Sequence, residues 1–197
     1  MSQLIESIWI KDQKRQNLKY HQARLEHACK HFFKSSCLYI LDKIIDPYAL
    51  QHEDVKCRFI YDASTYSLDY EIYKRRVIKK LKVINDDHIL YPIKKFQRPE
   101  LDRLFSLKED TDEIIIVKKG LVTDAFYYNL VFEDHNGFYT PQACLLKGTM
   151  RQRLLDKNKI SIKKIAIHDL AKYHRIHLIN ALNGLGSIVV ETSDVIL

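Results

Sequence analysis

The pattern of hydrophobic and polar residues predicts a strand followed by a helix near the start of the chain. In residues 4–10 apolar and polar side chains alternate, and Glu6 falls on the same face as Ile8 and Ile10, as in a half-buried strand. In residues 21–33 apolar residues recur every three or four positions, which is typical of an amphipathic helix. These residues are Leu25, Ala28, Cys29, Phe32 and Phe33.

The next segment changes to strand-like patterning. Asp46–Pro47 resembles a helix cap followed by a proline at the first helical position, so a short helix is expected over residues 47–53. From Val55 onwards, β-branched and aromatic residues alternate with polar ones, which predicts strands separated by turns. The expected strands cover residues 55–61, 64–73 and 75–84. Tyr91–Pro92 is the best candidate for a boundary between lobes, because the residue before a proline is held extended.

The second half alternates short helices with strands. Helices are expected at residues 99–107 and 149–155, and a buried strand at residues 113–117. Asn136–Gly137, between two strand-like runs, is a strong hairpin signal. The remaining expected elements are strands at 129–133, 138–140, 160–167, 176–180 and 187–190, and a helical turn at 169–172. The predicted class is α+β, with a small N-terminal α/β lobe (1–91) and a strand-rich C-terminal lobe (92–197).

Composition narrows the function classes. The 197 residues carry a formal net charge of +7, which suits an anionic partner without identifying it. Only five glycines occur, all between Gly120 and Gly186, which excludes a glycine-rich nucleotide loop from the first 119 residues. No apolar run is long enough for a membrane span, and the N-terminus does not resemble a signal peptide. The four cysteines lack CxxC spacing, so we expect reduced thiols in a cytoplasmic protein.

Two candidate binding features have simpler explanations. His27 and His31 are spaced like two metal ligands on a helix, but they lie off its apolar stripe with no acidic partner, so no metal is expected. The segment from Lys74 to Lys82 contains six basic residues and could follow nucleic-acid phosphates. A solvated strand face is the favoured interpretation, so nucleic acid is not an expected partner.

Two other features point to a small-molecule site. Gly148 directly precedes the predicted helix at 149–155, where the backbone could approach an anion and Thr149 adds a hydroxyl. A simple turn explains this segment equally well. Asp124 and Asn129 lie among apolar and aromatic residues, where a buried acid needs a partner. Local capping by Asp124 is the alternative.

A series of segments resembles the class IV aminotransferases, the pyridoxal phosphate enzymes of fold type IV. The series runs IESIWI, NLKYHQARLEHA, IKKFQR, DEIIIVKKGLVTDAFYYNLVF, FYTP, LLKGTMRQRLL and LINALNG. The close succession of VTDAFYYNLVF, YTP and KGTMRQ is its specific part. The family includes branched-chain and D-amino-acid aminotransferases and aminodeoxychorismate lyase, and the GTMRQ and IKKFQR segments are most similar to the lyase pattern. The resemblance implies a two-lobed D-amino-acid aminotransferase-like fold, a small anionic substrate, and a homodimer with its site between the lobes.

The resemblance also implies roles for individual residues. Lys94, four residues before Arg98, matches the catalytic lysine that forms a Schiff base with pyridoxal 5'-phosphate. Asp124 matches the acid that binds the pyridine nitrogen of the cofactor. The residues matched to the phosphate site are Arg24, Gly148, Thr149, Met150, Asn180 and Ala181.

Several positions depart from the family pattern. Asp124 stands where glutamate is usual, and Met150 stands where many members have threonine. We expect this chain to lack the hairpin that most members carry before the first strand. Gln97 and Arg98 are the nearest candidates to contact the cofactor's phenolic oxygen. These departures leave one alternative to an aminotransferase or lyase, a relative that keeps the fold without catalysis. The basic segment from Lys74 to Lys82 leaves a second alternative, a nucleic-acid-binding module.

Overall fold

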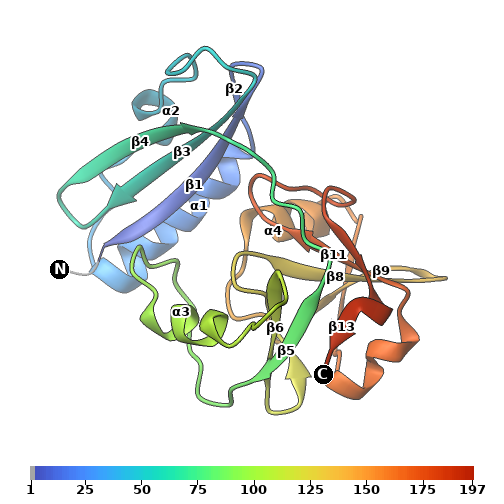
Figure 1. The fold of residues 1–197 in the computed structure, drawn as a ribbon. Helices are drawn as coiled ribbons and strands as arrows, with labels where there is room; N and C mark the ends of the chain where they lie inside the picture. Colours follow the sequence, from blue (N-terminus) through green and yellow to red (C-terminus); the bar gives the residue numbers. More distant parts are fainter. Residues whose placement is uncertain (1–2) are drawn as a thin grey trace. The chain divides into compact units, whose positions relative to one another are not determined.

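A computed structural model describes residues 3–197, which form two compact units (Figure 1). The first unit contains the chain up to Arg75 together with Ile93–Gln97, and the second contains Arg76–Pro92 and Arg98–Leu197. The chain therefore passes between the units three times, and one passage falls directly after Pro92. No helix among residues 3–197 has the length and apolar character needed to cross a membrane.

The first unit is built on an antiparallel sheet with the order β2-β1-β3-β4. Leu4 lies opposite Tyr61 and Ile8 lies opposite Cys57, so the buried residues of the two central strands share one face. The predicted strands at 4–10, 55–61 and 64–73 are confirmed. The strands are β1 (Leu4–Lys11), β2 (Lys14–Arg15), β3 (Asp54–Tyr61) and β4 (Tyr66–Ile72).

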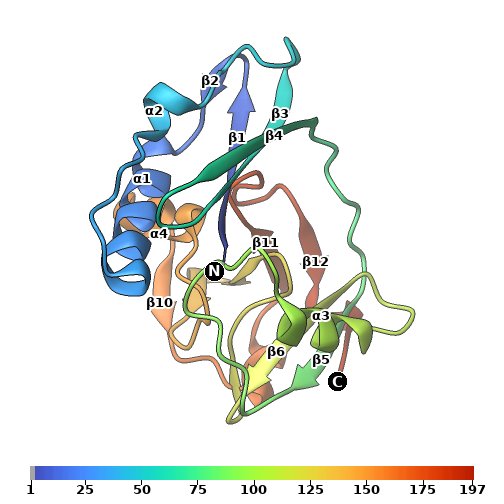
Figure 2. The ribbon, with the colours of Figure 1, turned by 90° about the vertical axis from the view of Figure 1, so that its left-hand side faces the viewer.

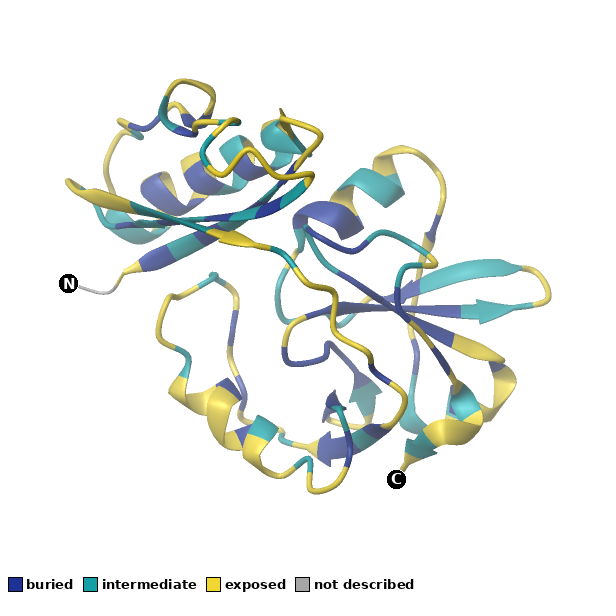
Figure 3. Cartoon of the chain, turned by 45° about the horizontal axis from the view of Figure 1, so that its top comes forward, coloured by how far each residue is buried: buried dark blue, intermediate teal, exposed yellow. Residues whose placement is uncertain are grey.

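A long helix of this unit also follows the predicted pattern. It is α1 (Leu18–Ala28), which begins three residues before the predicted start, and the chain continues as a π-helical segment η1 (Cys29–Phe33). Leu25 and Ala28 are buried in the same hydrophobic core as the inward-facing residues of β1 and β3. Figure 3 shows buried and exposed residues alternating around this helix.

The helix predicted at residues 47–53 is wrong. The short helix of this region is α2 (Leu41–Ile44), and residues 47–50 form a turn instead. Oδ1 of Asp46 accepts a hydrogen bond from the backbone N–H of Tyr48 at 2.9 Å. Asp46 therefore caps a local turn, which is the other conformation that an Asp-Pro pair favours.

Two sheets make up the framework of the second unit. One has the order β10-β9-β8-β11-β12 and the other β13-β5-β6-β7, in which β5 and β6 are parallel. Their strands are β5 (Leu81–Asn85), β6 (Glu113–Lys118), β7 (Leu121–Val122), β8 (Asn129–Asp134), β9 (Gly137–Pro141), β10 (Ser161–Lys163), β11 (Arg175–Ile179), β12 (Val189–Glu191) and β13 (Val195–Ile196). Together with the first unit this gives three sheets over residues 3–197, which confirms the predicted α+β class.

Three of the four helical segments of the second unit lie at or near the predicted positions, and the fourth, the 3-10 segment η3 (Thr192–Asp194), was not predicted. The other three are α3 (Pro99–Ser106), α4 (Thr149–Asp156) and the 3-10 segment η2 (Ile167–Lys172). Leu101 and Leu104 of α3 are buried in one cluster with Ile114 and Ile116 of β6, so α3 covers the sheet that contains β5 and β6 (Figure 2). The predicted hairpin is also confirmed: β8 pairs with β9, and Oδ1 of Asp134 accepts hydrogen bonds from the N–H groups of Asn136 and Gly137.

Two predicted strands are shorter than expected. The strand predicted at 75–84 begins only at Leu81, because Oδ2 of Asp112 accepts hydrogen bonds from the N–H groups of Lys79 and Lys80 at 2.8 and 3.0 Å. The strand predicted at 160–167 is limited to Ser161–Lys163. All four cysteines are free thiols, and Cys29 and Cys57 are buried.

Candidate active site

The carboxylate of Asp124 is buried and held by three hydrogen bonds. Asp124 follows β7 and is only 5% exposed. Its Oδ2 accepts hydrogen bonds from the backbone N–H groups of Leu145 and Leu146, both at 2.9 Å. Its Oδ1 accepts one from Nδ2 of Asn129 at 2.7 Å. A carboxylate offers about four acceptor positions, so these three bonds fix the group and leave one position on Oδ1.

The environment of Asp124 changes its acidity. Burial raises the pKa of this carboxyl to about 6, although hydrogen bonds from Leu146, Asn129 and Leu145 and the charge of Arg151 act in the opposite direction. A positively charged donor on the remaining acceptor position would lower the pKa again and keep the group ionised. The site is therefore suited to a cationic N–H donor.

Asn129 connects Asp124 to the start of α4. Its Nδ2 also donates to the backbone oxygen of Leu146 at 2.8 Å. Gly148 lies so close that a Cβ added there would be 2.0 Å from Oδ1 of Asn129. Gly148 has an ordinary φ of −69°, so glycine is required here by the close approach of Asn129 and not by backbone strain.

The predicted phosphate-site residues of the second unit lie around the start of α4. Thr149 and Met150 are buried in the first turn of the helix. Asn180 and Ala181 follow β11 in a turn where the Asn180 and Asn183 backbones exchange hydrogen bonds of 3.0 and 3.1 Å. The two turns are neighbours, because a Cβ added at Gly184 would lie 4.0 Å from Cε of Met150.

In the first unit, Arg24 of α1 is bound to Glu6 of β1. The Arg24 guanidinium donates from Nε to Oε1 of Glu6 at 2.7 Å and from Nη2 to Oε2 at 2.5 Å. Nδ1 of His21 lies 2.5 Å from the same Oε2. His21 and Arg24 lie on one side of the helix and Glu6 on the facing side of the strand, so this ion pair joins helix to sheet.

The electrostatics of this cluster favour an ionised Glu6. Burial acts to raise the pKa of Glu6, but the Arg24 charge and the His21 hydrogen bond outweigh it and hold the pKa at about 2. Burial lowers the pKa of His21, and the positive charges of Arg24 and Lys94 add to that effect against the contribution of Glu6. Lys94 therefore lies within electrostatic range of the cluster.

The segment that carries Lys94 is anchored on the first strand. The carbonyl oxygen of Lys94 accepts a hydrogen bond from the N–H of Ile5 at 3.0 Å, and Lys95 forms a β-bridge with Leu4. The N–H of Phe96 donates to the oxygen of Gln3 at 2.9 Å. Lys94 is half-buried whereas Lys95 is exposed. These contacts place Lys94 in the same unit as Arg24.

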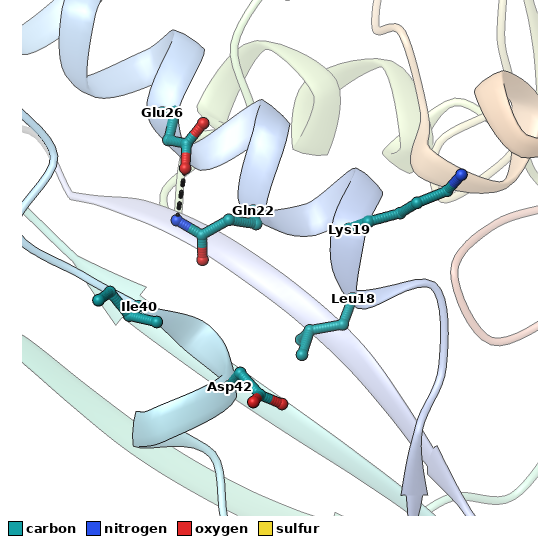
Figure 4. Close-up of a pocket in the computed structure, with 6 residues that line it drawn as sticks. All are labelled: Leu18, Lys19, Gln22, Glu26, Ile40 and Asp42. Atoms are coloured by element: carbon teal, nitrogen blue, oxygen red, sulfur yellow. Dashed lines mark hydrogen bonds between the residues drawn. The ribbon is translucent and has the colours of Figure 1, made fainter.

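Other sequence features have structural roles. In the basic segment, Arg76 lies 3.6 Å from Glu113 and Lys82 is paired with Glu109. Among residues 3–197 there is no group of three or more metal-ligating side chains. A pocket in the first unit, between α1 and α2, is lined by Leu18, Lys19, Gln22, Glu26, Ile40 and Asp42 (Figure 4). It contains none of the predicted site residues.

The sequence pattern does not reveal the contacts of two residues of the site. It predicts Glu6 only as an inward-facing strand residue, although Glu6 is the partner of Arg24. It places Asn129 beside Asp124 but does not show that Asn129 links Asp124 to the Gly148 turn. The signal for Glu6 was an acidic side chain on an otherwise apolar strand face, since such a group needs a buried counter-charge.

Comparison with known proteins gives consistent matches along the chain. The family profile described as amino-transferase class IV matches residues 3–190. An uncharacterized protein of Haemophilus influenzae is 35% identical over 188 residues, which cover 94% of this chain and 100% of that protein. A crystal structure described as a "putative 4-amino-4-deoxychorismate lyase", from Haemophilus somnus, is 37% identical, has a TM-score of 0.88, and covers 94% of this chain and 98% of its own. The PLP-bound form of a hypothetical aminotransferase from Mycobacterium tuberculosis shares the fold at 13% identity, with a TM-score of 0.79 over 98% of this chain and 81% of that one.

Proposed function

Because the chain belongs to the class IV aminotransferase family, we propose that it is an enzyme that uses pyridoxal 5'-phosphate to act on the amino group of a small anionic substrate. Its fold is the fold type IV, aminotransferase-like α+β fold. Lys94 is the proposed catalytic residue. Asp124 and the phosphate-site residues would hold the cofactor.

The observation that carries this proposal is the buried, fixed carboxylate of Asp124. Three hydrogen bonds orient it and leave one acceptor position on Oδ1. A protonated pyridine nitrogen is a cationic N–H donor of the kind this position accepts, and the charge pair would hold that proton on the ring. The residues present therefore fit the cofactor. Aspartate provides the same charge as the glutamate that is usual at this position.

The proposed cofactor contributes chemistry that amino-acid side chains lack. When bound, pyridoxal phosphate supplies a ring that accepts electrons from the substrate's α-carbon. Lys94 would bind it through the ε-amino group and then, as a free amine, move the proton at that carbon. An uncharged amine is needed for that step.

The phosphate group would be held by charge and by backbone N–H groups. The first N–H groups of α4, after Gly148, lack partners within the helix and carry partial positive charge. Arg24 provides a full positive charge, and its two hydrogen bonds to Glu6 set the direction of its guanidinium. Glu6 therefore acts as a positioning residue for Arg24.

Two reactions fit this proposal. One transfers an amino group to a 2-oxo acid, and the other is the lyase reaction that releases 4-aminobenzoate and pyruvate from aminodeoxychorismate. The 37% identity to the protein described as a lyase supports the second reaction. A catalytically degenerate relative and a nucleic-acid-binding module are the alternatives. Two of the six basic residues of the segment, Arg76 and Lys82, lie in ion pairs with Glu113 and Glu109.

The test compares turnover of the unchanged protein with that of two variants. With cofactor added, 4-aminobenzoate release from aminodeoxychorismate and transfer from L- and D-amino donors are measured side by side. Asp124→Asn should lower the rate of whichever reaction occurs at least about 100-fold, because a neutral amide cannot stabilise the ring proton. Asp156→Asn, which changes a carboxylate on the exposed end of α4, is the matched control. Cofactor binding without any turnover would identify the degenerate relative, and salt-sensitive nucleic-acid binding without cofactor would identify the module.

A further inference from the structure

Two cysteines of the first unit belong to the same hydrophobic core. Cys29 is the first residue of η1 and is 2% exposed. Cys37 lies in the loop between η1 and α2, where it is half-buried and packs against the core cluster that contains Cys29. Both are free thiols. Two reduced sulfurs from one short stretch of the chain therefore share one core.

The backbone turns back toward Cys29 before it reaches Cys37. The π-helical segment ends at Lys34, whose φ of 57° is left-handed. The N–H of the next residue, Ser35, donates to the carbonyl oxygen of Cys29 at 3.1 Å. Beyond this turn, the Cys37 thiol donates to the carbonyl oxygen of Tyr39 at 3.5 Å, which orients its sulfur. The hydrogen bonds of this loop therefore hold Cys37 close to Cys29.

The two thiols lie close enough to influence each other. Burial raises the pKa of Cys29 to about 12, and a hydrogen-bonding contact with the Cys37 thiol adds to the rise. Burial also raises the pKa of the Tyr39 and Tyr61 hydroxyls, and both thiols add to each of these shifts. The two tyrosine rings are neighbours, with centroids 6.1 Å apart. Cys29 and Cys37 thus lie beside each other and beside the same pair of rings.

Neither simple packing nor metal binding explains this pair. Zinc sites built on cysteine use four ligands, and residues 3–197 contain no group of even three metal-ligating side chains. Cys57 shows what a thiol buried on its own looks like in this unit. Burial raises its pKa to about 12 as well, but its hydrogen-bonding neighbour is the Tyr70 hydroxyl rather than a second thiol. The pairing of two sulfurs is therefore particular to Cys29 and Cys37.

We propose that Cys29 and Cys37 form a redox site that closes to a reversible disulfide by exchange with a small disulfide such as oxidised glutathione. This inference does not depend on the proposed function, because it requires neither cofactor nor substrate. Cys37 reacts first, since it is the more exposed of the two sulfurs. The exposed positive charge of Lys34, three residues away, favours the approach of an anionic peptide disulfide. The disulfide would fix the segment that directly follows α1, the helix that carries Arg24.

The reaction consists of two exchange steps. Cys37 loses its proton to water, and its thiolate attacks one sulfur of oxidised glutathione. A bond forms between that sulfur and Sγ of Cys37, the glutathione S–S bond breaks, and the first glutathione leaves as a thiolate. Cys29 then loses its proton, attacks Sγ of Cys37, and displaces the second glutathione. Two protein thiols are oxidised, one glutathione disulfide is reduced, and the two protons end on the two glutathione thiols.

The test counts and locates thiols after oxidation. The full chain is equilibrated with excess oxidised glutathione, denatured in N-ethylmaleimide and analysed by mass spectrometry. Two fewer labels than in the reduced protein are expected. Trypsin cleaves after Lys30 and Lys34, so the disulfide should appear as two linked peptides that separate on reduction. The oxidised protein should also unfold at a higher urea concentration than the reduced protein, because a cross-link restricts the unfolded chain.

Three variants separate the two steps. Cys29→Ser should stop the reaction after the first step, so glutathione stays attached to Cys37. Cys37→Ser should form neither the disulfide nor an adduct on Cys29, and should lose the difference in urea midpoint between oxidised and reduced protein. Cys144→Ser is the matched control, because it removes a half-buried thiol of the second unit. It should keep the disulfide and the shift in midpoint.

Several outcomes would overturn the inference. They are four free thiols in the oxidised sample, a disulfide that includes Cys57, a disulfide between two chains, and a glutathione adduct on Cys37 that persists beside a free Cys29 in the unchanged protein. If the buried substitution Cys29→Ser prevents folding, the peptide map of the unchanged protein and the half-buried Cys37→Ser variant still decide between these results.

Discussion

Asn129 holds Asp124 by a 2.7 Å hydrogen bond from its Nδ2 to Oδ1 of the carboxylate. The same amide reaches the backbone oxygen of Leu146, just before α4. One side chain thus links the proposed partner of the ring nitrogen to the proposed phosphate turn. The geometry of both parts depends on this residue.

Replacing Asn129 should therefore weaken both stability and cofactor binding. Asn129→Ala leaves Oδ1 of Asp124 and the oxygen of Leu146 buried without that donor, and should lower the free energy of unfolding by about 1–3 kcal/mol. Urea denaturation measures the loss. Asn136→Ala, in the exposed hairpin turn, serves as the control. Equal effects of the two substitutions would contradict the linking role of Asn129.

The two glycines near Met150 should respond differently to alanine. A Cβ at Gly148 would meet Oδ1 of Asn129 at 2.0 Å, so Gly148→Ala must displace that amide and should cost about 1–3 kcal/mol. A Cβ at Gly184 meets only the flexible end of Met150 at 4.0 Å, so Gly184→Ala should leave stability nearly unchanged. Thermal unfolding of both variants, with cofactor titrations, checks the contrast. If Gly148→Ala leaves the unfolding temperature unchanged, the close approach of Gly148 to Asn129 does not require a glycine.

Glu6 should contribute acid-sensitive stability. Its pKa of about 2 in the folded state lies below the ordinary value of 4.5. The folded state therefore binds fewer protons between these values, and the stabilisation is present above pH 4.5 and is lost as the pH falls toward 2. The shift corresponds to about 3 kcal/mol. Urea denaturation at pH 6, 4 and 3 should show this decline in the unchanged protein, and Glu6→Gln should make the decline smaller. An identical decline in the variant would contradict the role assigned to Glu6.

Glu113 should change the free energy of unfolding in the opposite direction to Glu6, and in a higher pH range. Its pKa of about 7 lies above the ordinary value of 4.5, so the folded state binds more protons than the unfolded state between these values. Its contribution to stability is therefore greatest below pH 4.5 and is lost as the pH rises to 7. Glu113→Gln should reduce the fall in stability over this range. If the slope stays the same, Glu113 does not titrate as assigned.

Much of the fold could be predicted because local patterns and tertiary packing agree. The alternation around Ile8 and the hairpin at Asn136–Gly137 both match the structure. Prediction failed where a distant or alternative contact decides the local conformation. Asp112 fixes the backbone before Leu81 from 32 residues away, and the cap at Asp46 forms a turn where a helix was expected.

The candidate site could be predicted only in part. The positions of Asp124 and the Gly148 turn follow from short motifs, and the structure adds their link through Asn129. The pairing of Arg24 with Glu6 joins a helix to a strand 18 residues away, which no local pattern specifies. The ring contacts of Phe105 with Phe126 and Tyr127 likewise join two separate segments. The homodimer and the roles of the individual site residues stay predictions.

The central claim is tested most directly by locating the covalent attachment of the cofactor. The protein is incubated with pyridoxal phosphate, reduced with borohydride, digested, and analysed by mass spectrometry. Before reduction, we predict a yellow protein with an absorption band at the violet end of the visible spectrum. After reduction, we predict a stable pyridoxyl adduct on Lys94. Lys94→Ala should abolish this adduct, and Lys95→Ala should leave it intact. An adduct on Lys95, adducts scattered over many lysines, or none at all would contradict the account.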